Sequence, residues 1–522
     1  MELKRTIAIA LLTVCGVAHA QVLRWATQGD PQTMDPHSQN EGLTNSVNGQ
    51  VYETLIKRDR QLQLMPGLAT QWTQLTPTLW RLNLRSGVLF HDGSPFTAED
   101  VVFSIKRAQL PSSAFQAYAS AMGEPRVVNA TTVEFDLPQF NPIFLQHATQ
   151  IFVMNRAWSE KNGSAAPLNF KNKETSHAGL NANGTGPYTL VSRQPDVRTT
   201  FKRNSRWWGN FEGNVQEVIY TPLRSDATRT AGLIAGELDL VLDPPPQDIL
   251  TLRQAPDLQV VDGVENRIIF IGMDQAREEL TYSSVKGRNP FKDVRVRRAL
   301  YHAVNIETLR TNLMRNQAVP TGSVMHNAQG TFEDPEFERR LPFDLGRARA
   351  LLTQAGYPTG FDVTLDCPNN RYINDEAVCV ALAAMWARVG VKVKVNSMPR
   401  TLFFPKMEKL DTSMYLLGWG GAVTDAETTL TPVLRSRGDK GVGQYNFGNY
   451  KNTKLDALAA ASSLEPDPSK RAAIIKAAFR EHNDQVHHIP LYRQVIPWAM
   501  RKNVAAVHRA DNWLEWSWVT IR

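Results

Sequence analysis

The chain has 522 residues, which is too many for a single hydrophobic core, so we expect two or three domains. Its content of 42% hydrophobic and 21% charged residues is that of an ordinary globular protein and excludes a disordered or fibrous chain. The net charge of +7 is spread along the sequence without a dense run of lysine and arginine, which argues against nucleic-acid binding.

The N-terminus has the pattern of a cleavable export signal. The basic pair Lys4–Arg5 precedes an apolar stretch at 6–14 that is too short to span a bilayer. Ala18-His19-Ala20 then supplies small residues at the two positions that signal peptidase reads. We therefore expect residues 1–20 to be removed and the mature protein to lie in the periplasm.

Two cysteines follow the expected signal, Cys367 and Cys379, twelve positions apart. In an oxidising compartment, an isolated pair at this spacing predicts a disulfide. Such a loop contributes about 3 kcal/mol of stability in the chain-entropy account. A metal pair or a nucleophile is the alternative, but neither cysteine has a histidine nearby in the sequence.

The first half of the mature chain mixes strand and helix patterns. A strand is expected at 22–26, and Thr33, in the polar loop that follows, is a candidate ligand-binding residue. A helix is expected at 43–56. Residues 79–84 alternate in polarity like a strand, and Thr97 opens an apolar helix as its N-cap.

The segment from Met414 to Leu430 has the pattern of a ligand site. The short apolar run 414–417 predicts a strand buried on both faces, and it ends in the glycine-rich sequence 418–421. The glycines permit unusual backbone angles and close approach, so we expect a turn there. Thr424 or Asp425 can cap a helix that runs towards residue 434.

A strand, a glycine turn and a helix start form ligand sites at the carboxyl edge of open α/β sheets. In this sequence Trp419 would add a flat apolar surface with one hydrogen-bond donor, beside Gly420 and Gly421. The alternative is a glycine-rich turn whose tryptophan only covers the core. The local pattern leaves both interpretations open.

Six motifs occur in order along nearly the whole mature chain. They are the stretch LMPGLATQWTQLTPTLWRLNLRSGVLFHDGSPFTAEDVVFSIK at 64–106, NGTGPY at 183–188, FKRNSRWWG at 201–209, AGELD at 235–239, NPFKDVRVRRAL at 289–300 and IPLY at 489–492. In this order and spacing they closely resemble the extracellular solute-binding proteins, family 5. That family comprises the oligopeptide-, dipeptide-, nickel- and glutathione-binding components of bacterial ABC importers.

The resemblance implies an α/β periplasmic binding protein of type II, in the large peptide-binding subclass, with two lobes that close on a ligand. The first lobe would contain 21–270 and 489–522, with an inserted subdomain at about 59–181. The second lobe would contain 271–488. The amphipathic helix expected at 469–486 ends just before the second crossing between the lobes. A monomer is expected, with the transmembrane subunits of an ABC permease as its partner.

The resemblance also implies where a ligand would bind. Peptide-binding members place an aspartate, which pairs with the peptide's free amino group, shortly after the Gly418–Trp419 pair. Here that position holds Ala422, and Asp425 follows three residues later. The resemblance therefore implies a site around Trp419 that lacks the usual partner for an ammonium group. The alternative is that Asp425 reaches back and takes this role.

A second implied site segment is Asn370-Arg371-Tyr372. Dipeptide binders carry Arg-Pro-Tyr here, and the arginine meets the ligand carboxylate. Tyr372 matches this pattern, while Arg371 is displaced by one residue. Arg371 could meet an anion with help from the helix that starts near Asn374. The alternative is a solvated arginine on a loop closed by the disulfide.

No motif indicates catalysis, a resident metal or a cofactor. Ser283 and Lys286 fit Ser-x-x-Lys, but the companion motifs of that enzyme class are absent from the sequence. His482, His487 and His488 cluster near a helix end at spacings that do not place ligands on one helix face. We therefore expect a binding protein and not an enzyme. The alternatives are an exported hydrolase on the same scaffold, and a sensory or chaperone-like binding protein without its own permease.

Overall fold

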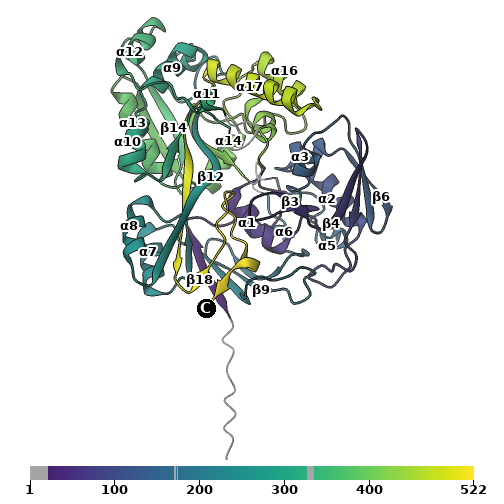
Figure 1. Cartoon of the computed structure of the whole chain (residues 1–522). Helices are drawn as coiled ribbons and strands as arrows, with labels where there is room; N and C mark the ends of the chain where they lie inside the picture. Colours follow the sequence, from purple (N-terminus) through teal and green to yellow (C-terminus); the bar gives the residue numbers. More distant parts are fainter. Residues whose placement is uncertain (1–20, 170–171, 173, 326–333, 422) are drawn as a thin grey trace, which may run out of the picture.

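The structure is a computed structural model that describes residues 21–169, 172, 174–325, 334–421 and 423–522. The expected export signal and Ala422 lie outside the described residues. Figure 1 shows two lobes joined by two long strands, with a smaller subdomain packed at the side of one of them. Within the described ranges, no helix is both long and apolar enough to cross a membrane.

A mixed sheet of eleven strands, counted over the described residues, connects both lobes in the order β15-β14-β16-β12-β17-β11-β1-β10-β9-β8, with β13 beside β17. These strands are β1 (Val22–Thr27), β8 (Tyr188–Gln194), β9 (Arg198–Arg203), β10 (Glu217–Pro222), β11 (Leu240–Leu242), β12 (Leu258–Met273), β13 (Ala318–Pro320), β14 (Asp362–Pro368), β15 (Lys392–Met398), β16 (Met414–Gly420) and β17 (His488–Arg501). The antiparallel pair β12 and β17 crosses between the lobes. In β12 the residues from Glu265 onward are buried without a break, as expected for a strand covered on both faces.

The subdomain is built on a four-stranded antiparallel sheet in the order β4-β5-β7-β6. Its strands are β4 (Ala69–Thr76), β5 (Leu79–Leu84), β6 (Glu124–Asn129) and β7 (Thr132–Asp136), and the short pair β2 (Ile56–Arg58) and β3 (Leu64–Pro66) connects it to the first lobe. In β5, Leu82 and Leu84 are buried while Arg81 and Asn83 are exposed, which confirms the strand predicted from alternation. The sheet packs its apolar face against helix α2 (Ala98–Ala108) in one hydrophobic cluster.

Figure 1 shows the helices packed around the sheets. Besides α2 they are α1 (Gly42–Val51), α3 (Gln116–Ala121), α4 (Phe144–His147), α5 (Arg156–Lys161), α6 (His177–Leu180), α7 (Asp226–Ala235), α8 (Ile249–Gln254), α9 (Val294–His302), α10 (Ile306–Thr308), α11 (Pro335–Glu338), α12 (Leu345–Gln354), α13 (Asp375–Ala387), α14 (Arg400–Glu408), α15 (Glu427–Thr429), α16 (Thr453–Ser462) and α17 (Pro468–Gln485). The amphipathic helix expected at 469–486 is therefore confirmed as α17. The helix expected at 43–56 ends earlier, at Val51, because the chain turns into the strand pair β2–β3.

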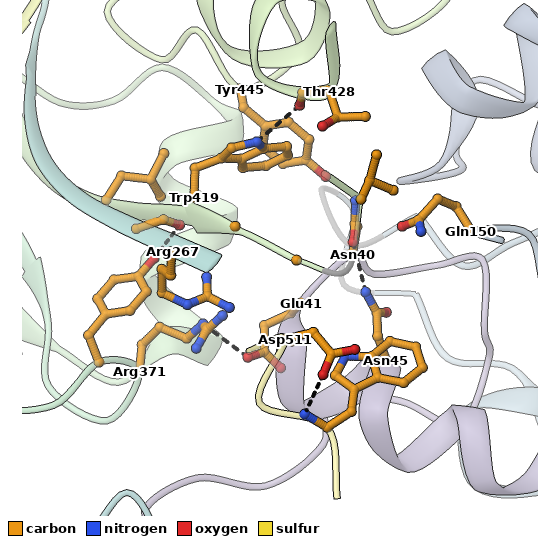
Figure 2. A pocket seen from close by; sticks show the side chains of 18 of the residues that line it. Asn40, Glu41, Asn45, Gln150, Arg267, Arg371, Trp419, Thr428, Tyr445 and Asp511 are labelled. Atoms are coloured by element: carbon orange, nitrogen blue, oxygen red, sulfur yellow. Dashed lines mark hydrogen bonds and ion pairs between the residues drawn. The ribbon is translucent and has the colours of Figure 1, made fainter. Parts of the chain in front are cut away.

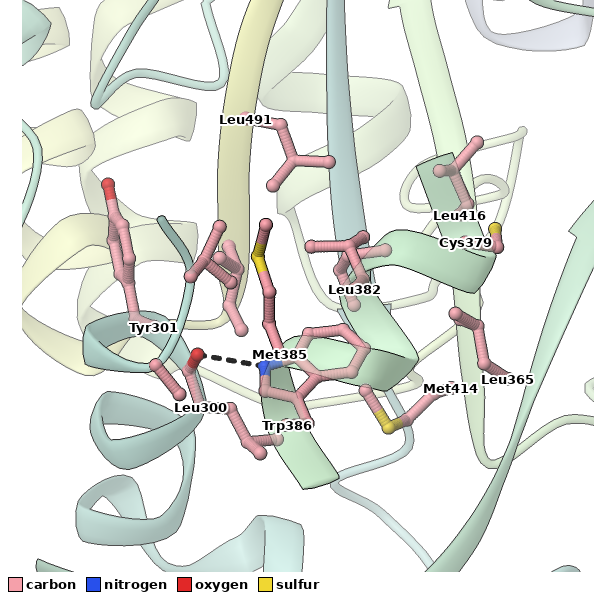
Figure 3. Packing of buried hydrophobic residues seen from close by; sticks show 14 of the residues in the cluster. Leu300, Tyr301, Leu365, Cys379, Leu382, Met385, Trp386, Met414, Leu416 and Leu491 are labelled. Carbon is pink, nitrogen blue, oxygen red and sulfur yellow. Dashed lines mark hydrogen bonds between the residues drawn. The ribbon is translucent and has the colours of Figure 1, made fainter. Parts of the chain in front are cut away.

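The second lobe has its own core around α13, shown in Figure 3. Trp386 is fully buried there, and its indole Nε1 donates a hydrogen bond of 2.9 Å to the carbonyl of Leu300 in α9, which satisfies its only polar group. Cys379, also in α13, forms the predicted disulfide with Cys367 at the end of β14. The bridge ties the first half of α13 to the end of β14.

Candidate functional site

A cavity lies between the start of α1, the end of β16 and the loop after β14. It contains about 810 Å³ of atom-free space, part of which is open to solvent. The described residues that line it are Asn40, Glu41, Gly42, Asn45, Tyr118, Gln150, Arg267, Arg371, Tyr372, Phe404, Leu417, Gly418, Trp419, Gly420, Gly421, Val423, Thr428, Tyr445, Asp511 and Trp513. Figure 2 shows the arginines and the aromatic pair Trp419 and Tyr445 in different parts of this cavity.

The glycines at the end of β16 differ from the expected turn, because β16 continues as a strand through Gly420. A Cβ on Gly418 would lie 2.6 Å from the ring of Tyr372, and one on Gly420 would overlap the carbonyl oxygen of Asn266 in β12. Both glycines are therefore required by packing within the protein. A Cβ on Gly421 would have no atom within 4 Å, so the packing that requires Gly418 and Gly420 does not require this glycine.

Trp419 lines the cavity. Its indole Nε1 donates to the carbonyl of Thr428 (3.0 Å), so its one polar group is already used within the protein. The ring lies 4.7 Å from that of Tyr445, at an angle of 48°. Trp419 also packs against a hydrophobic core cluster of the second lobe, so its place in the structure is compatible with both sequence interpretations.

The loop between β14 and α13 brings Arg371 and Tyr372 to the cavity. The carboxylate of Asp375, at the start of α13, accepts both backbone N–H groups, from Arg371 at 2.9 Å and from Tyr372 at 3.0 Å. The hydroxyl of Tyr372 donates to the carbonyl of Gly418 (3.2 Å). These contacts and the disulfide fix the loop from both ends.

Two guanidinium groups meet at Gly42, the first residue of α1. A Cβ on Gly42 would lie 3.1 Å from Nη2 of Arg267 and 3.4 Å from Nη2 of Arg371. Arg267 donates through Nε to Glu265 (2.7 Å), and within the described part of the chain its other guanidinium nitrogens make no hydrogen bond. This end of the cavity therefore presents N–H donors that are not used by the protein.

Glu41 is the N-cap of α1 and accepts the backbone N–H groups of Leu43 and Thr44. Its carboxylate also pairs with two arginines, Arg371 at 2.9 Å and Arg400 at 3.1 Å. Burial alone would raise the pKa of Glu41, but the two guanidinium groups hold it at about 2. Two positive charges share this one carboxylate.

Asp511 is the other carboxylate that lines the cavity. It is buried, and it forms an ion pair of 2.5 Å with Arg509. It also accepts the backbone N–H of Trp513 at 3.2 Å. Both described carboxylates of the cavity wall, Glu41 and Asp511, are therefore already paired with arginine.

Two residues proposed from the sequence do not line this cavity. Asp425 accepts two hydrogen bonds of 2.7 Å each from the guanidinium of Arg471, and it caps the N–H of Glu427 (2.9 Å). Thr33 is buried, and its Oγ1 accepts the N–H of Asp35 (3.0 Å). Ala422 lies outside the described residues, while Trp419, Gly420, Gly421, Arg371 and Tyr372 all line the cavity.

Sequence reasoning did not identify Glu41, Arg267, Asp511 or Tyr445 as site residues. The sequence around Arg267 contains a signal that could have identified it as a site residue. Arg267 directly precedes the apolar run 268–271 of a buried strand, where a charged residue is unusual. The other three lie in loops or at a helix start whose local sequence is ordinary.

The clustered histidines have partners of their own. His482 and His488 share a hydrogen bond of 2.9 Å between ring nitrogens, and His487 contacts Gln275 (2.8 Å) and stacks on Tyr450. Among the residues that the structure describes, no group of three or more histidine, cysteine or acidic side chains is placed to hold a metal ion.

Residues 63–441 match the bacterial extracellular solute-binding proteins, family 5, in its middle region. The di/tripeptide-binding protein 1 of Pseudomonas aeruginosa is 25% identical over 520 residues, which cover 95% of this chain and 93% of that protein.

Two solved structures have the same fold. The periplasmic binding protein DppA of Helicobacter pylori, in complex with the peptide STSA, has a TM-score of 0.85 at 20% identity and covers 96% of this chain and 98% of its own. The binding protein AgaA of A. tumefaciens R10, in complex with agropinic acid, has a TM-score of 0.84 at 19% identity, with coverage of 96% and 99%.

Proposed function

The chain belongs to the bacterial extracellular solute-binding proteins, family 5, and we propose that it captures a small ligand with an anionic end and an apolar or planar body. A blocked peptide or a non-peptide organic acid fits this description. We propose that it acts in the periplasm and delivers the ligand to the transmembrane subunits of an ABC permease, without catalysis.

The observation that carries this proposal is the pair of arginines at Gly42. Arg267 and Arg371 direct N–H donors to one end of the cavity, and a planar guanidinium suits a carboxylate in geometry and charge. Arg267 pairs with Glu265 through Nε alone, and Glu41 is shared between Arg371 and Arg400, so these two carboxylates leave N–H donors of Arg267 unused. An anionic group would supply the missing acceptors.

The proposed ligand has no free ammonium group. Glu41 and Asp511 already pair with arginine, and the family resemblance places Ala422 at the position where peptide-binding members have an aspartate. Asp425 is engaged by Arg471. A buried ammonium without a carboxylate partner costs several kcal/mol, which disfavours unmodified peptides.

The rest of the cavity suits an apolar or planar body with neutral polar atoms. Trp419, Tyr445 and Trp513 contribute aromatic surface, while Asn45 and Gln150 contribute amides. Aromatic rings with few polar groups are typical of small-molecule sites. The same fold is seen in complex with a peptide in DppA and with agropinic acid in AgaA. The fold therefore does not determine the ligand class, and we infer the class from the side chains of the cavity.

We propose that the lobes, 21–270 with 489–522 and 271–488, close over the ligand. The ion pairs of Glu41 with Arg371 and Arg400 join α1 to second-lobe segments and would form on closure. The alternative of an exported hydrolase has little support, since the Ser283 hydroxyl donates to the carbonyl of Asp362 and Lys286 pairs with Glu279 (3.1 Å).

Titration calorimetry with matched free and N-acetylated dipeptides tests the proposal. We expect the acetylated forms to bind at least tenfold more tightly, because they carry the anionic end without the ammonium. Ala422→Asp is the matched variant, and it should shift the preference towards free dipeptides. Submicromolar binding of free dipeptides by the unaltered protein, lost in Asp425→Ala, would overturn the proposal. Native mass spectrometry of protein purified from its own periplasm would identify the natural ligand.

A further inference from the structure

A second, open groove lies next to the ligand cavity. It contains about 1900 Å³ of atom-free space, much of it open to solvent, between residues 110–114 of the subdomain and 437–442 of the second lobe. The cavity and the groove share two lining residues, Phe404 of α14 and Tyr445. These two aromatic side chains form the boundary between the two spaces, which we call the aromatic wall.

Tyr445 is held in the wall by contacts on several sides. Its backbone N–H donates to the carbonyl of Pro432 (2.8 Å), and its ring lies 4.7 Å from that of Trp419. Its hydroxyl donates to the carbonyl of Ala114 at 3.4 Å, and Nε2 of Gln444 donates to the same oxygen at 3.0 Å. The side chain is only 6% exposed, so the ring has little freedom to move.

The wall joins the two lobes. Ala114 belongs to the subdomain of the first lobe, and its own N–H is fixed by the carbonyl of His37 (3.0 Å). Tyr445 and Gln444 belong to the second lobe. The wall is therefore complete only when the lobes are together.

The wall lies away from the arginine end of the cavity. Figure 2 shows Tyr445 and Trp419 on the side of Thr428, and Arg267 and Arg371 near Glu41. A ligand whose anionic group is bound by the arginines therefore extends its other end towards the aromatic side chains. A ligand that is too long would have to displace the Tyr445 ring from Trp419 or keep the lobes apart.

We propose that Tyr445, with Phe404, sets the maximum length of the ligand by closing the cavity off from the groove. The inference rests on the proposed function, since it assumes an anionic end bound at Arg267 and Arg371. The wall acts against longer ligands by steric exclusion, which is a common way to obtain specificity when attractive contacts are similar. Opening the wall gives a longer ligand a path into solvent-filled space.

The test is calorimetry with N-acetyl-alanine and its N-acetylated di-, tri- and tetra-alanine homologues. For the unaltered protein we expect one step in the series at which affinity falls at least tenfold. Tyr445→Ala should reduce that fall to less than threefold. Tyr445→Phe is the matched control and should keep the step, because it retains the ring and loses only the hydroxyl.

Phe404→Ala opens the wall independently of Tyr445. Thermal melting shows whether Tyr445→Ala folds, and if it does not, the same ligand series is measured on Phe404→Ala. A step that persists in the folded wall-opening variants would overturn the inference while leaving the proposed ligand class intact. The inference is also overturned if the unaltered protein binds all lengths equally, or if Tyr445→Phe loses the step. If the unaltered protein binds no member of the series, blocked peptides are excluded from the proposed ligand class, and the inference falls with them.

Discussion

Replacing Asp425 with alanine is expected to destabilise the second lobe while leaving ligand affinity nearly unchanged. Both carboxylate oxygens of Asp425 accept hydrogen bonds from Arg471 at 2.7 Å, and the two side chains are only 10% and 9% exposed. Removing one partner of such a buried pair leaves an uncompensated charge, at a cost of about 3–5 kcal/mol. The lost cap on the N–H of Glu427 adds about 1 kcal/mol.

Urea unfolding of the unaltered protein, Asp425→Ala, Arg471→Met and the double variant measures this effect. Arg471→Met should lose about 3–5 kcal/mol and Asp425→Ala about 4–6 kcal/mol, because each leaves one buried charge alone and Asp425→Ala also loses the cap. The double variant should lose much less than the sum, since no charge remains and methionine fills part of the arginine's volume. Calorimetry on the folded Asp425→Ala protein should give a dissociation constant within about threefold of the unaltered value.

The contrary result is equally specific. An Asp425→Ala protein as stable as the unaltered one, but unable to bind ligand, would show that the carboxylate serves the ligand and not Arg471. The structural role inferred from the ion pair would then be wrong.

Three further changes have defined outcomes. Arg371 and Arg400 hold the pKa of Glu41 at about 2, below its ordinary 4.5. Glu41 therefore contributes about 3 kcal/mol to the free energy of unfolding above pH 4.5, and this contribution is lost as the pH falls towards 2. In urea unfolding, Glu41→Gln should be less stable than the unaltered protein at pH 7, and the two stabilities should converge at low pH. Burial lowers the pKa of His482 to about 4, so stability should fall as the pH drops from 6.5 to 4, and His482→Gln should flatten this slope in the same assay. Replacing Cys367 and Cys379 by serine should cost about 3 kcal/mol in urea and weaken anion binding, because the closed loop carries Arg371; unchanged affinity would contradict the second part.

Much of the fold could be predicted from local sequence. The strand at 79–84 and the helix at 469–486 follow from alternation and amphipathic spacing, which depend only on residues close in the chain. The disulfide followed from the count and spacing of Cys367 and Cys379. These features need no knowledge of long-range packing.

The glycine-rich end of β16 shows where local reasoning was insufficient. Gly418 and Gly420 were expected to form a turn, but they lie in a strand that packs against Tyr372 and the backbone of Asn266. A glycine required by a distant side chain has the same local pattern as one required by a turn. Only the tertiary contacts distinguish the two.

The site itself was predicted in part. Trp419 and Arg371 were singled out and both line the cavity, whereas Glu41, Arg267 and Asp511 were not. These three come from a helix start, a central strand and the C-terminal segment, which are brought together by the fold alone. Their roles depend on ion pairs between residues far apart in sequence, and no local pattern encodes such pairs.

The central claim is that an anionic ligand group is bound by Arg371 beside Arg267. The most direct measurement compares the affinity of an N-acetylated dipeptide with that of its C-terminal amide, in the unaltered protein, in Arg371→Met, and in Arg347→Met as a control on the exposed face of α12. We predict that the unaltered protein and the control prefer the carboxylate by at least tenfold, about 1.4 kcal/mol, and that Arg371→Met loses this preference. Equal binding of acid and amide by the unaltered protein, or an undiminished preference in Arg371→Met, would contradict it.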